Sequence, residues 1–124
     1  MSILVVDDEP MMTDVIKMML SLYLDARVVT TNSPHEALEI LAGDPVSLLI
    51  TDYFMPGMNG LELIKTVRER QLSMPIIVLT GYYDSPELKL GNQTFGTFEI
   101  MGKPWSNAKL VERIKLLTAT AAAT

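Results

Sequence analysis

The chain has 124 residues, of which 48% are hydrophobic and 20% charged, and its net charge is −5. This length and composition fit one globular domain with an apolar core and exclude a disordered segment. The lack of cysteine excludes disulfides, zinc–thiolate sites and a thiol nucleophile, and the acidic balance argues against direct nucleic-acid binding, which depends on basic side chains. Asp7 and Asp8 come too early for a signal peptide, and no apolar run approaches the ~20 residues of a membrane span, so we expect a soluble cytoplasmic protein without a membrane partner.

The first third of the chain predicts two strands and two helices. Residues 3–6 are a continuous apolar run, which is typical of a strand buried on both faces, and Pro10 suits the first turn of a helix. Residues 26–31 predict a weak second strand. Apolar side chains at helical spacing predict one buried stripe on the first helix, formed by Met12, Val15, Ile16, Met19 and Tyr23.

The second helix carries clear end signals. Residues 33–36 read as an N-cap serine, a proline at the first helical position and a capping-box glutamate, and Gly43 ends the helix. His35, the only histidine of the chain, lies in the first turn, where we expect it to be solvated rather than catalytic. The predicted buried face consists of Ala37, Leu38 and Leu41.

Two further strands are predicted at 47–52 and 76–80. Between them, Asn59 and Glu62 can cap a third helix. The side chains of that helix expected to face inward are Leu61, Ile64 and Val67.

The segment after the fourth strand is less regular. Ser85-Pro86-Glu87 begins a helix well, but Gly91-Asn92 and Gly96 follow closely, so we predict a short or irregular fourth helix with a mobile loop behind it. A fifth strand is predicted at 98–101, and Ser106 caps a last helix. The expected buried face of that helix is Leu110, Val111, Ile114 and Leu117.

The alternation of five strands with five helical segments predicts a parallel sheet covered by helices on both faces. We expect one domain over residues 1–118. Residues 119–124 contain only alanine and threonine, and we interpret them as a frayed helix end or the start of a linker.

Acidic residues follow two of the predicted strands. Asp7 and Asp8 end the first strand and Asp52 ends the third, and ligands of α/β sheets bind at this edge. If the two strands are neighbours, three carboxylates lie close together and repel one another unless a cation separates them. Mg²⁺ suits such oxygen ligands and leaves room for a phosphoryl group, so we interpret Asp52 as a phosphate acceptor.

Two other strand ends carry complementary chemistry. The hydroxyl of Thr80 and the ammonium of Lys103 can each contact an oxygen of a phosphoryl group on Asp52. Pro104 fixes how the chain turns away, and Gly81 leaves open space for water or a phosphodonor. Each of these residues alone has an ordinary structural explanation, but the ordered set, each member closing a different strand, favours one common site.

These motifs resemble those of the receiver domain of two-component response regulators. The matching segments are Val-Val-Asp-Asp-Glu-Pro at 5–10, Asp-Tyr-Phe-Met-Pro-Gly-Met-Asn-Gly at 52–60, Leu-Thr-Gly at 79–81 and Lys-Pro at 103–104. The resemblance extends from residue 3 to about residue 117.

The resemblance implies a flavodoxin-like, doubly wound five-stranded sheet of order 2-1-3-4-5. It also implies Mg²⁺-dependent phosphotransfer to Asp52 from a sensor histidine kinase or a phosphotransfer protein, with Thr80 as the switch hydroxyl and Lys103 in contact with the phosphoryl group. The readout would be an output domain, a partner protein or a homodimer at the face of the fourth helix, the fifth strand and the last helix.

The resemblance also implies a set of metal ligands. Asp8 and Asp52 would bind Mg²⁺ directly, Asp7 would bind it through water, and the backbone carbonyl of Phe54 would be a further ligand. The chain would then be a signalling phosphoacceptor that catalyses only its own phosphorylation and dephosphorylation.

Three positions depart from the family pattern. Ile100 stands where the family usually has an aromatic switch residue, for which Tyr82 or Phe98 could substitute. Phe54, two positions after the phosphate acceptor, and Tyr82 could restrict water at the pocket mouth and so set the phosphoryl lifetime. Gly91 weakens the fourth helix, which belongs to the signalling face.

Two alternatives remain at this point. One is a Mg²⁺-dependent phosphatase with an aspartyl nucleophile. Such an enzyme normally needs a second catalytic aspartate shortly after the nucleophile, but the residue two positions after Asp52 is Phe54. We also expect no cap domain in this sequence to exclude water from the site. A receiver-like binding module that is never phosphorylated is disfavoured by the intact acidic, threonine and lysine positions, whereas Ile100 leaves it open.

Overall fold

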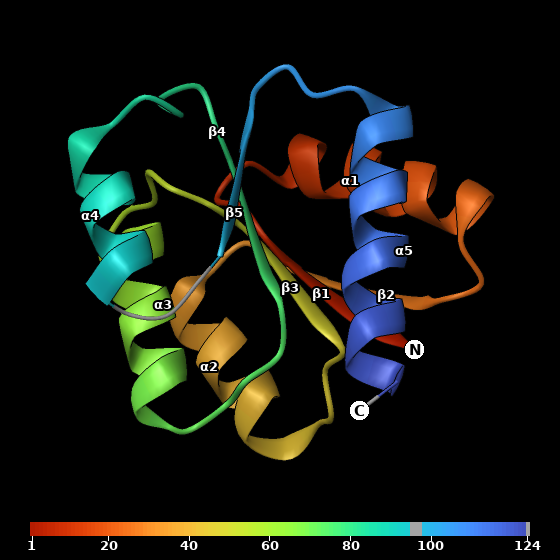
Figure 1. Ribbon diagram of the computed structural model, residues 1–124, viewed down its shortest axis with the longest axis horizontal. Coiled ribbons are helices and arrows are strands. Elements are labelled where there is room, and N and C mark those ends of the chain that lie inside the picture. Colours follow the sequence, from red (N-terminus) through yellow and green to blue (C-terminus); the bar gives the residue numbers. More distant parts are fainter. Residues whose placement is uncertain (95–97, 124) are drawn as a thin grey trace.

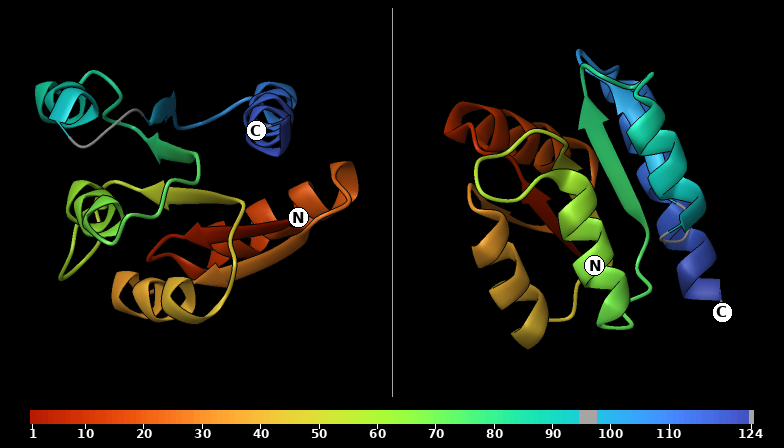
Figure 2. Two further views of the ribbon diagram at one scale, coloured as in Figure 1. Left: turned by 60° about the horizontal axis from the view of Figure 1, so that its bottom comes forward. Right: turned by 90° about the vertical axis from the view of Figure 1, so that its left-hand side faces the viewer.

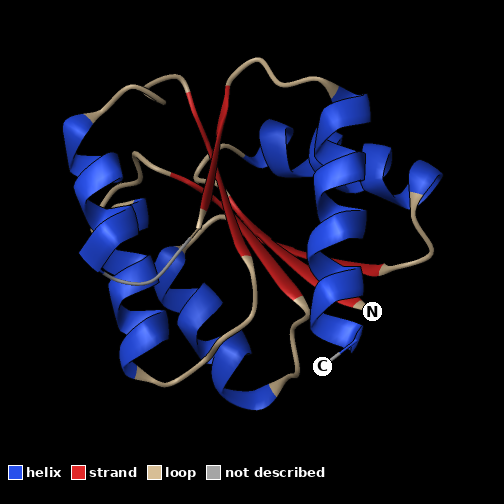
Figure 3. Cartoon of the chain, viewed as in Figure 1, coloured by secondary structure: helices blue, strands red, loops and turns tan. Residues whose placement is uncertain are grey.

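The computed structural model describes residues 1–94 and 98–123 and contains one five-stranded sheet in that part of the chain (Figures 1 and 3). The strands lie in the order β2-β1-β3-β4-β5, and every neighbouring pair is parallel. This order confirms the predicted flavodoxin-like fold. The strands are β1 (Ser2–Val6), β2 (Arg27–Thr31), β3 (Leu48–Asp52), β4 (Ile76–Thr80) and β5 (Glu99–Gly102).

Helices cover both faces of the sheet, as Figures 1 and 2 show. One core cluster joins α2 (Pro34–Gly43), α3 (Gly60–Glu69) and α4 (Pro86–Thr94) to one face, and a second joins α1 (Pro10–Tyr23) and α5 (Asn107–Ala123) to the other. Alternate residues of the central strands enter the two clusters, which explains why these strands are continuous apolar runs.

The predicted N-caps of α2 and α3 are present, and the reciprocal capping box is found in α3. The Ser33 hydroxyl accepts a hydrogen bond from the backbone N–H of Glu36. Asn59 and Glu62 form a reciprocal capping box, with distances of 2.9 and 3.2 Å. Leu61 is half-buried, while the fully buried side chains of α3 are Leu63, Ile64 and Val67.

The predicted buried stripe of α1 is wrong at two positions. Ile16 and Met19 are buried and Met12 is half-buried, but Val15 is 51% exposed and Tyr23 is 59% exposed. The helix is apolar around more of its circumference than the sheet can cover, so hydrophobic spacing alone does not select the buried side. The other buried residues of α1 are Thr13 and Leu20, and its other exposed apolar residues are Met11, Met18 and Leu22.

The fourth helix has nine residues and continues through Gly91 and Asn92. Gly91 is buried, and a Cβ at this position would run into the side chain of Leu61 on α3. The glycine therefore permits close packing of two helices rather than ending one of them. The loop predicted to be mobile includes residues 95–97, which lie outside the described residues. At the other end of the chain, α5 extends through residues 119–123, and Thr124 is likewise outside the described part.

Candidate functional site

Three carboxylates meet at the carboxyl edge of the sheet. Strands β1 and β3 are direct neighbours, with Val6 opposite Thr51, so the residues that follow come together. Side-chain oxygens of Asp7, Asp8 and Asp52 lie within 4.8 Å of one another. Asp7 is buried and the other two are half-buried, so the cluster is partly removed from water.

Lys103 directly follows the edge strand β5 and reaches the same cluster. Its ammonium Nζ lies 2.9 Å from Asp7 Oδ2 and 3.3 Å from Asp52 Oδ1. Burial lowers the pKa of Lys103, but the bond to Asp7 and the charges of both carboxylates outweigh that effect, and the pKa lies above its usual value. The side chain therefore remains a cation facing the two carboxylates.

The carboxyl group of Asp52 is in an unfavourable environment for an anion. Burial and the charge of Asp7 raise its pKa, against the opposing influence of Lys103 and of the Tyr53 backbone N–H, which donates to Asp52 Oδ1 at 2.8 Å. One ammonium does not fully compensate three carboxylates. A further cation at this position would relieve their repulsion.

Thr80 lies at the same edge, at the end of β4. Strand β4 lies between β3 and β5, with Leu79 opposite Asp52 and Thr80 opposite Gly102. The side chain of Thr80 is buried, and its Oγ1 accepts a hydrogen bond from the Tyr82 backbone N–H at 3.0 Å. Asp52 and Thr80 thus end neighbouring strands, and the other predicted side chains follow the ends of β1 and β5.

Three aromatic rings pack together in the segments that directly follow Asp52 and Thr80. Phe54 and Tyr82 are more than half exposed, and their rings pack edge to face with centroids 4.8 Å apart. Phe54 also packs against Tyr53, at 4.6 Å. The three rings contribute to the wall of a cavity of about 530 Å³ that continues along residues 81–87 to the start of α4.

Ile100 lies on β5 at the position where the family usually has an aromatic switch residue. Ile100 is half-buried against the α2–α4 side of the core, and Phe98 is buried in that core. Tyr83 instead lies over Gly102 of β5, where a Cβ would be 3.1 Å from the ring. The loop after β4 therefore places an aromatic ring against the end of β5.

Sequence reasoning missed two structural supports of the site. Gly60 donates its N–H to the Tyr53 carbonyl at 2.7 Å, and a Cβ on Gly60 would lie 2.5 Å from the Asp52 carbonyl oxygen. The position of this glycine, next to the Asn59 cap, was an available signal.

The second support is a hydrogen bond from the Tyr53 hydroxyl to Glu87 Oε2, at 2.6 Å. Burial, and next the bond to Glu87, raises the pKa of Tyr53 to about 12. No local pattern signals this contact, because the two residues are 34 positions apart.

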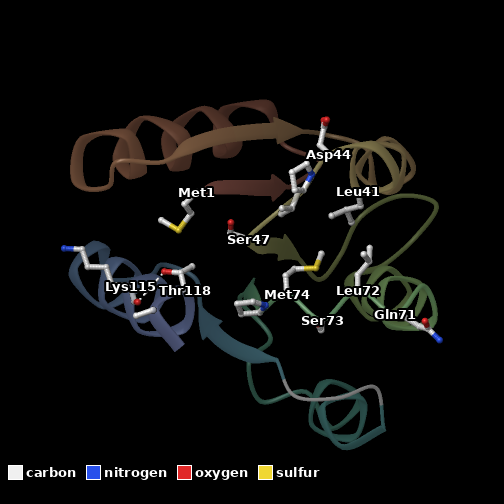
Figure 4. A pocket seen from close by; sticks show the side chains of 14 residues that line it. Met1, Leu41, Asp44, Ser47, Gln71, Leu72, Ser73, Met74, Lys115 and Thr118 are labelled. Carbon is white, nitrogen blue, oxygen red and sulfur yellow. Dashed lines mark hydrogen bonds between the residues drawn. The ribbon is translucent and has the colours of Figure 1, made fainter. Parts of the chain in front are cut away.

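A larger groove lies at the opposite edge of the sheet. It has a volume of about 980 Å³ and is lined by residues that precede β3 and β4, among them Ser47 and Met74, and by Lys115 and Thr118 of α5 (Figure 4). The acidic cluster follows the carboxyl ends of the strands, so this groove is separate from it.

The fold and the site point to one class of protein, and comparison with known proteins agrees. The family model for the response regulator receiver domain matches residues 3–115, so the chain belongs to this family. It is 36% identical over 114 residues to the hydrogenase transcriptional regulatory protein HoxA of Cupriavidus necator, and 31% identical over 115 residues to the response regulator SaeR of Staphylococcus aureus. These alignments cover 92% and 93% of this chain but only 23% and 49% of the two relatives.

Solved structures show the same likeness. The receiver domain of the Francisella response regulator 1452 matches with a TM-score of 0.87 and 25% identity, covering 97% of this chain and 98% of that one. The chemotaxis protein CheY4 of Vibrio cholerae matches with a TM-score of 0.85 and 27% identity, covering 94% and 97%. The chain is thus a receiver domain of two-component signal transduction, and the phosphatase alternative is not favoured. None of the helices in the described residues is long and apolar enough to cross a membrane.

Proposed function

We propose that Asp52 accepts a phosphoryl group from the phosphohistidine of a sensor histidine kinase or phosphotransfer protein. The observation that carries this proposal is the ammonium of Lys103, which lies between Asp7 and Asp52 at 2.9 and 3.3 Å. A cation placed against a half-buried carboxylate can also contact a phosphoryl oxygen bonded to that carboxylate.

The acidic cluster fits a divalent cation. Three carboxylates whose oxygens lie within 4.8 Å provide hard oxygen ligands with incompletely balanced charge, which is the chemistry that Mg²⁺ prefers. We assign Asp8 and Asp52 as direct ligands, Asp7 as a ligand through water and the Phe54 carbonyl as a further ligand. When bound, Mg²⁺ supplies positive charge opposite the phosphoryl oxygens.

In the transfer step, an oxygen of Asp52 forms a bond to phosphorus while the phosphorus–nitrogen bond of the donor histidine breaks. The electron pair of that bond returns to the imidazole nitrogen, which takes up a proton. Lys103 faces the added negative charge, and the Tyr53 N–H holds Asp52 Oδ1 in place. The chain would catalyse only this step and the later hydrolysis of its own phosphate.

The response starts at Thr80. Its hydroxyl now accepts the Tyr82 N–H, so a turn toward the phosphoryl group would release that bond and rearrange the loop before α4. We infer that the face of α4, β5 and α5 carries this change to an output domain, a partner protein or a second copy. The alignments cover only 23% and 49% of the two relatives, and the covered part corresponds to the receiver domain that we place at residues 1–118.

Intact mass measurement after incubation with acetyl phosphate and Mg²⁺ tests the proposal. We expect the mass of a single phosphoryl group on the wild-type chain and none on Asp52→Asn. An Asp44→Asn variant, altered at an exposed aspartate away from the site, should behave like the wild type. Continued turnover of the donor would instead indicate a phosphatase, and no reaction would indicate a receiver-like binding module.

A further inference from the structure

Tyr53 connects the phosphate acceptor to α4. Its backbone N–H donates to Asp52 Oδ1 at 2.8 Å, and its hydroxyl donates to Glu87 Oε2, in the first turn of α4, at 2.6 Å. One residue therefore contacts both the group that would be phosphorylated and the helix that follows the switch threonine.

The tyrosine is the fixed end of this connection. It is only 2% exposed, it packs in the core cluster formed with α2, α3 and α4, and its carbonyl accepts the Gly60 N–H at 2.7 Å. Close packing leaves such a ring little freedom to move. Glu87, in contrast, lies on the exposed side of α4. A change in this hydrogen bond therefore comes from the Glu87 side, through rotation of its side chain or movement of α4.

Hydrogen bonds link the switch threonine to the same helix turn. Thr80 Oγ1 accepts the Tyr82 N–H, the Tyr82 carbonyl accepts the Ser85 N–H, and the Ser85 carbonyl accepts the Lys89 N–H, at 2.9 to 3.2 Å. Thr80 and Glu87 are seven positions apart. If Thr80 releases Tyr82, this series loses its first bond, and the start of α4 is free to shift relative to Tyr53.

We propose that the Tyr53–Glu87 hydrogen bond is a latch that holds α4 in its unphosphorylated arrangement and opens when Asp52 is phosphorylated. This inference rests on the function proposed above. A bond made in only one of two arrangements favours that arrangement, so its loss must strengthen binding of any ligand selective for the other one. Tyr53 is thus a positioning residue that opposes activation.

Two single variants and their combination test the latch. Tyr53→Phe removes the hydroxyl and keeps the ring, and Glu87→Ala removes the acceptor on an exposed position, where folding is not at risk. In each variant we expect amide exchange at residues 89–91 to rise about tenfold, because a hydrogen bond to a charged group is lost. The double variant should exchange no faster than either single variant, since both remove the same bond.

The second readout is the affinity for beryllofluoride with Mg²⁺, a mimic of the phosphoryl group on a carboxylate. Tyr53→Phe and Glu87→Ala should each bind it several-fold more tightly than the wild type. Glu87→Gln, which retains an acceptor oxygen, should restore most of the wild-type behaviour. Tyr23→Phe, which changes an exposed tyrosine on α1, is the matched control and should alter neither measurement.

The outcomes separate this inference from the function on which it rests. Unchanged exchange in α4 of both single variants would overturn the latch, and so would faster exchange with unchanged beryllofluoride affinity, because the bond would then be only structural. If the wild type bound no beryllofluoride and accepted no phosphoryl group, the proposed function would fail and the switching role with it. In that case the exchange measurement would still report whether the bond holds α4.

Discussion

The two sides of the acidic site are built differently. On the β1–β3 side, Asp7 and Asp52 are held by backbone N–H groups and by Lys103, and Gly60 places α3 directly against the β3 backbone. On the β4–α4 side, residues 81–84 are all exposed, and the loop is held through Thr80 and Tyr82. The first side has the rigidity that a chemical site needs, while the second has the freedom that a signal needs.

The helices that flank the two sides repeat this contrast. Helix α3 has a complete capping box and buries three large side chains, whereas among the described side chains of α4 only Leu88 is a buried large apolar group. Because α4 has fewer buried contacts, a single hydrogen bond such as that from Tyr53 to Glu87 has more influence on its position.

The largest effect is expected at Gly60. In Gly60→Ala the new Cβ would lie 2.5 Å from the Asp52 carbonyl oxygen and 3.1 Å from the Tyr53 Cα, and neither backbone atom can move without disturbing β3. We expect the free energy of unfolding to fall by about 1–3 kcal/mol, with slower phosphorylation of Asp52. Urea denaturation and intact mass would measure both. If the free energy of unfolding and the phosphorylation rate both equalled the wild-type values, the β1–β3 side would be less rigid than we infer.

The second-largest effect is expected for Phe54→Asn, which should shorten the lifetime of the phosphorylated state. Phe54 and Tyr82 follow Asp52 and Thr80 by two positions and pack edge to face, and we expect removal of the Phe54 ring to allow water to approach Asp52. We expect phosphate loss to accelerate about tenfold, which corresponds to about 1.4 kcal/mol of barrier. The decay of phosphorylated protein after removal of the donor measures this rate. An unchanged rate would show that the ring pair does not restrict water.

Asp52→Asn should stabilise the metal-free protein at neutral pH. Burial raises the pKa of Asp52, so the folded state binds this proton more tightly than the unfolded chain, and ionisation of the group costs stability. The advantage of the variant should shrink as the pH falls toward 3.8, the ordinary value for an aspartate, because the wild-type carboxyl is then protonated too.

Urea denaturation across this pH range, with and without Mg²⁺, is the measurement for Asp52→Asn. We expect Mg²⁺ to stabilise the wild type more than the variant, since the variant lacks one of the assigned ligands. A variant that is equally stabilised by Mg²⁺ would contradict the assignment of Asp52 as a metal ligand.

The smallest effect is expected at Gly91. A Cβ there meets the end of the flexible Leu61 side chain rather than the backbone, so Leu61 can turn away. The better helix propensity of alanine, about 1 kcal/mol, should offset much of the packing cost, and the free energy of unfolding should change by less than about 1 kcal/mol. Thermal unfolding of Gly91→Ala and Gly60→Ala compares the stability lost at these two positions. Equal losses of stability would contradict the inferred difference between the β1–β3 side and the β4–α4 side.

Local sequence determined the elements and the edge at which the chemistry lies. The Ser33 and Asn59 caps depend on residues within one helical turn, and the burial of β1 and β4 follows from runs of apolar residues that any α/β sheet must cover on both faces. Because parallel strands point the same way, acidic, hydroxyl and ammonium groups at their ends had to share one edge. That Asp7, Asp8 and Asp52 meet depends on β1 and β3 being neighbours, which the sequence indicated only through its resemblance to receiver domains.

Only the tertiary structure decided which apolar side of α1 is buried, why Gly91 is tolerated in α4, and that Tyr53 reaches Glu87. Val15 and Ile16 are equally apolar, and the sheet covers only one of them. Gly91 lies against a helix that starts 31 positions earlier, and the Tyr53–Glu87 bond spans 34 positions. Such contacts depend on how packed elements are placed relative to one another, and periodicity and capping rules extend only a few residues along the chain.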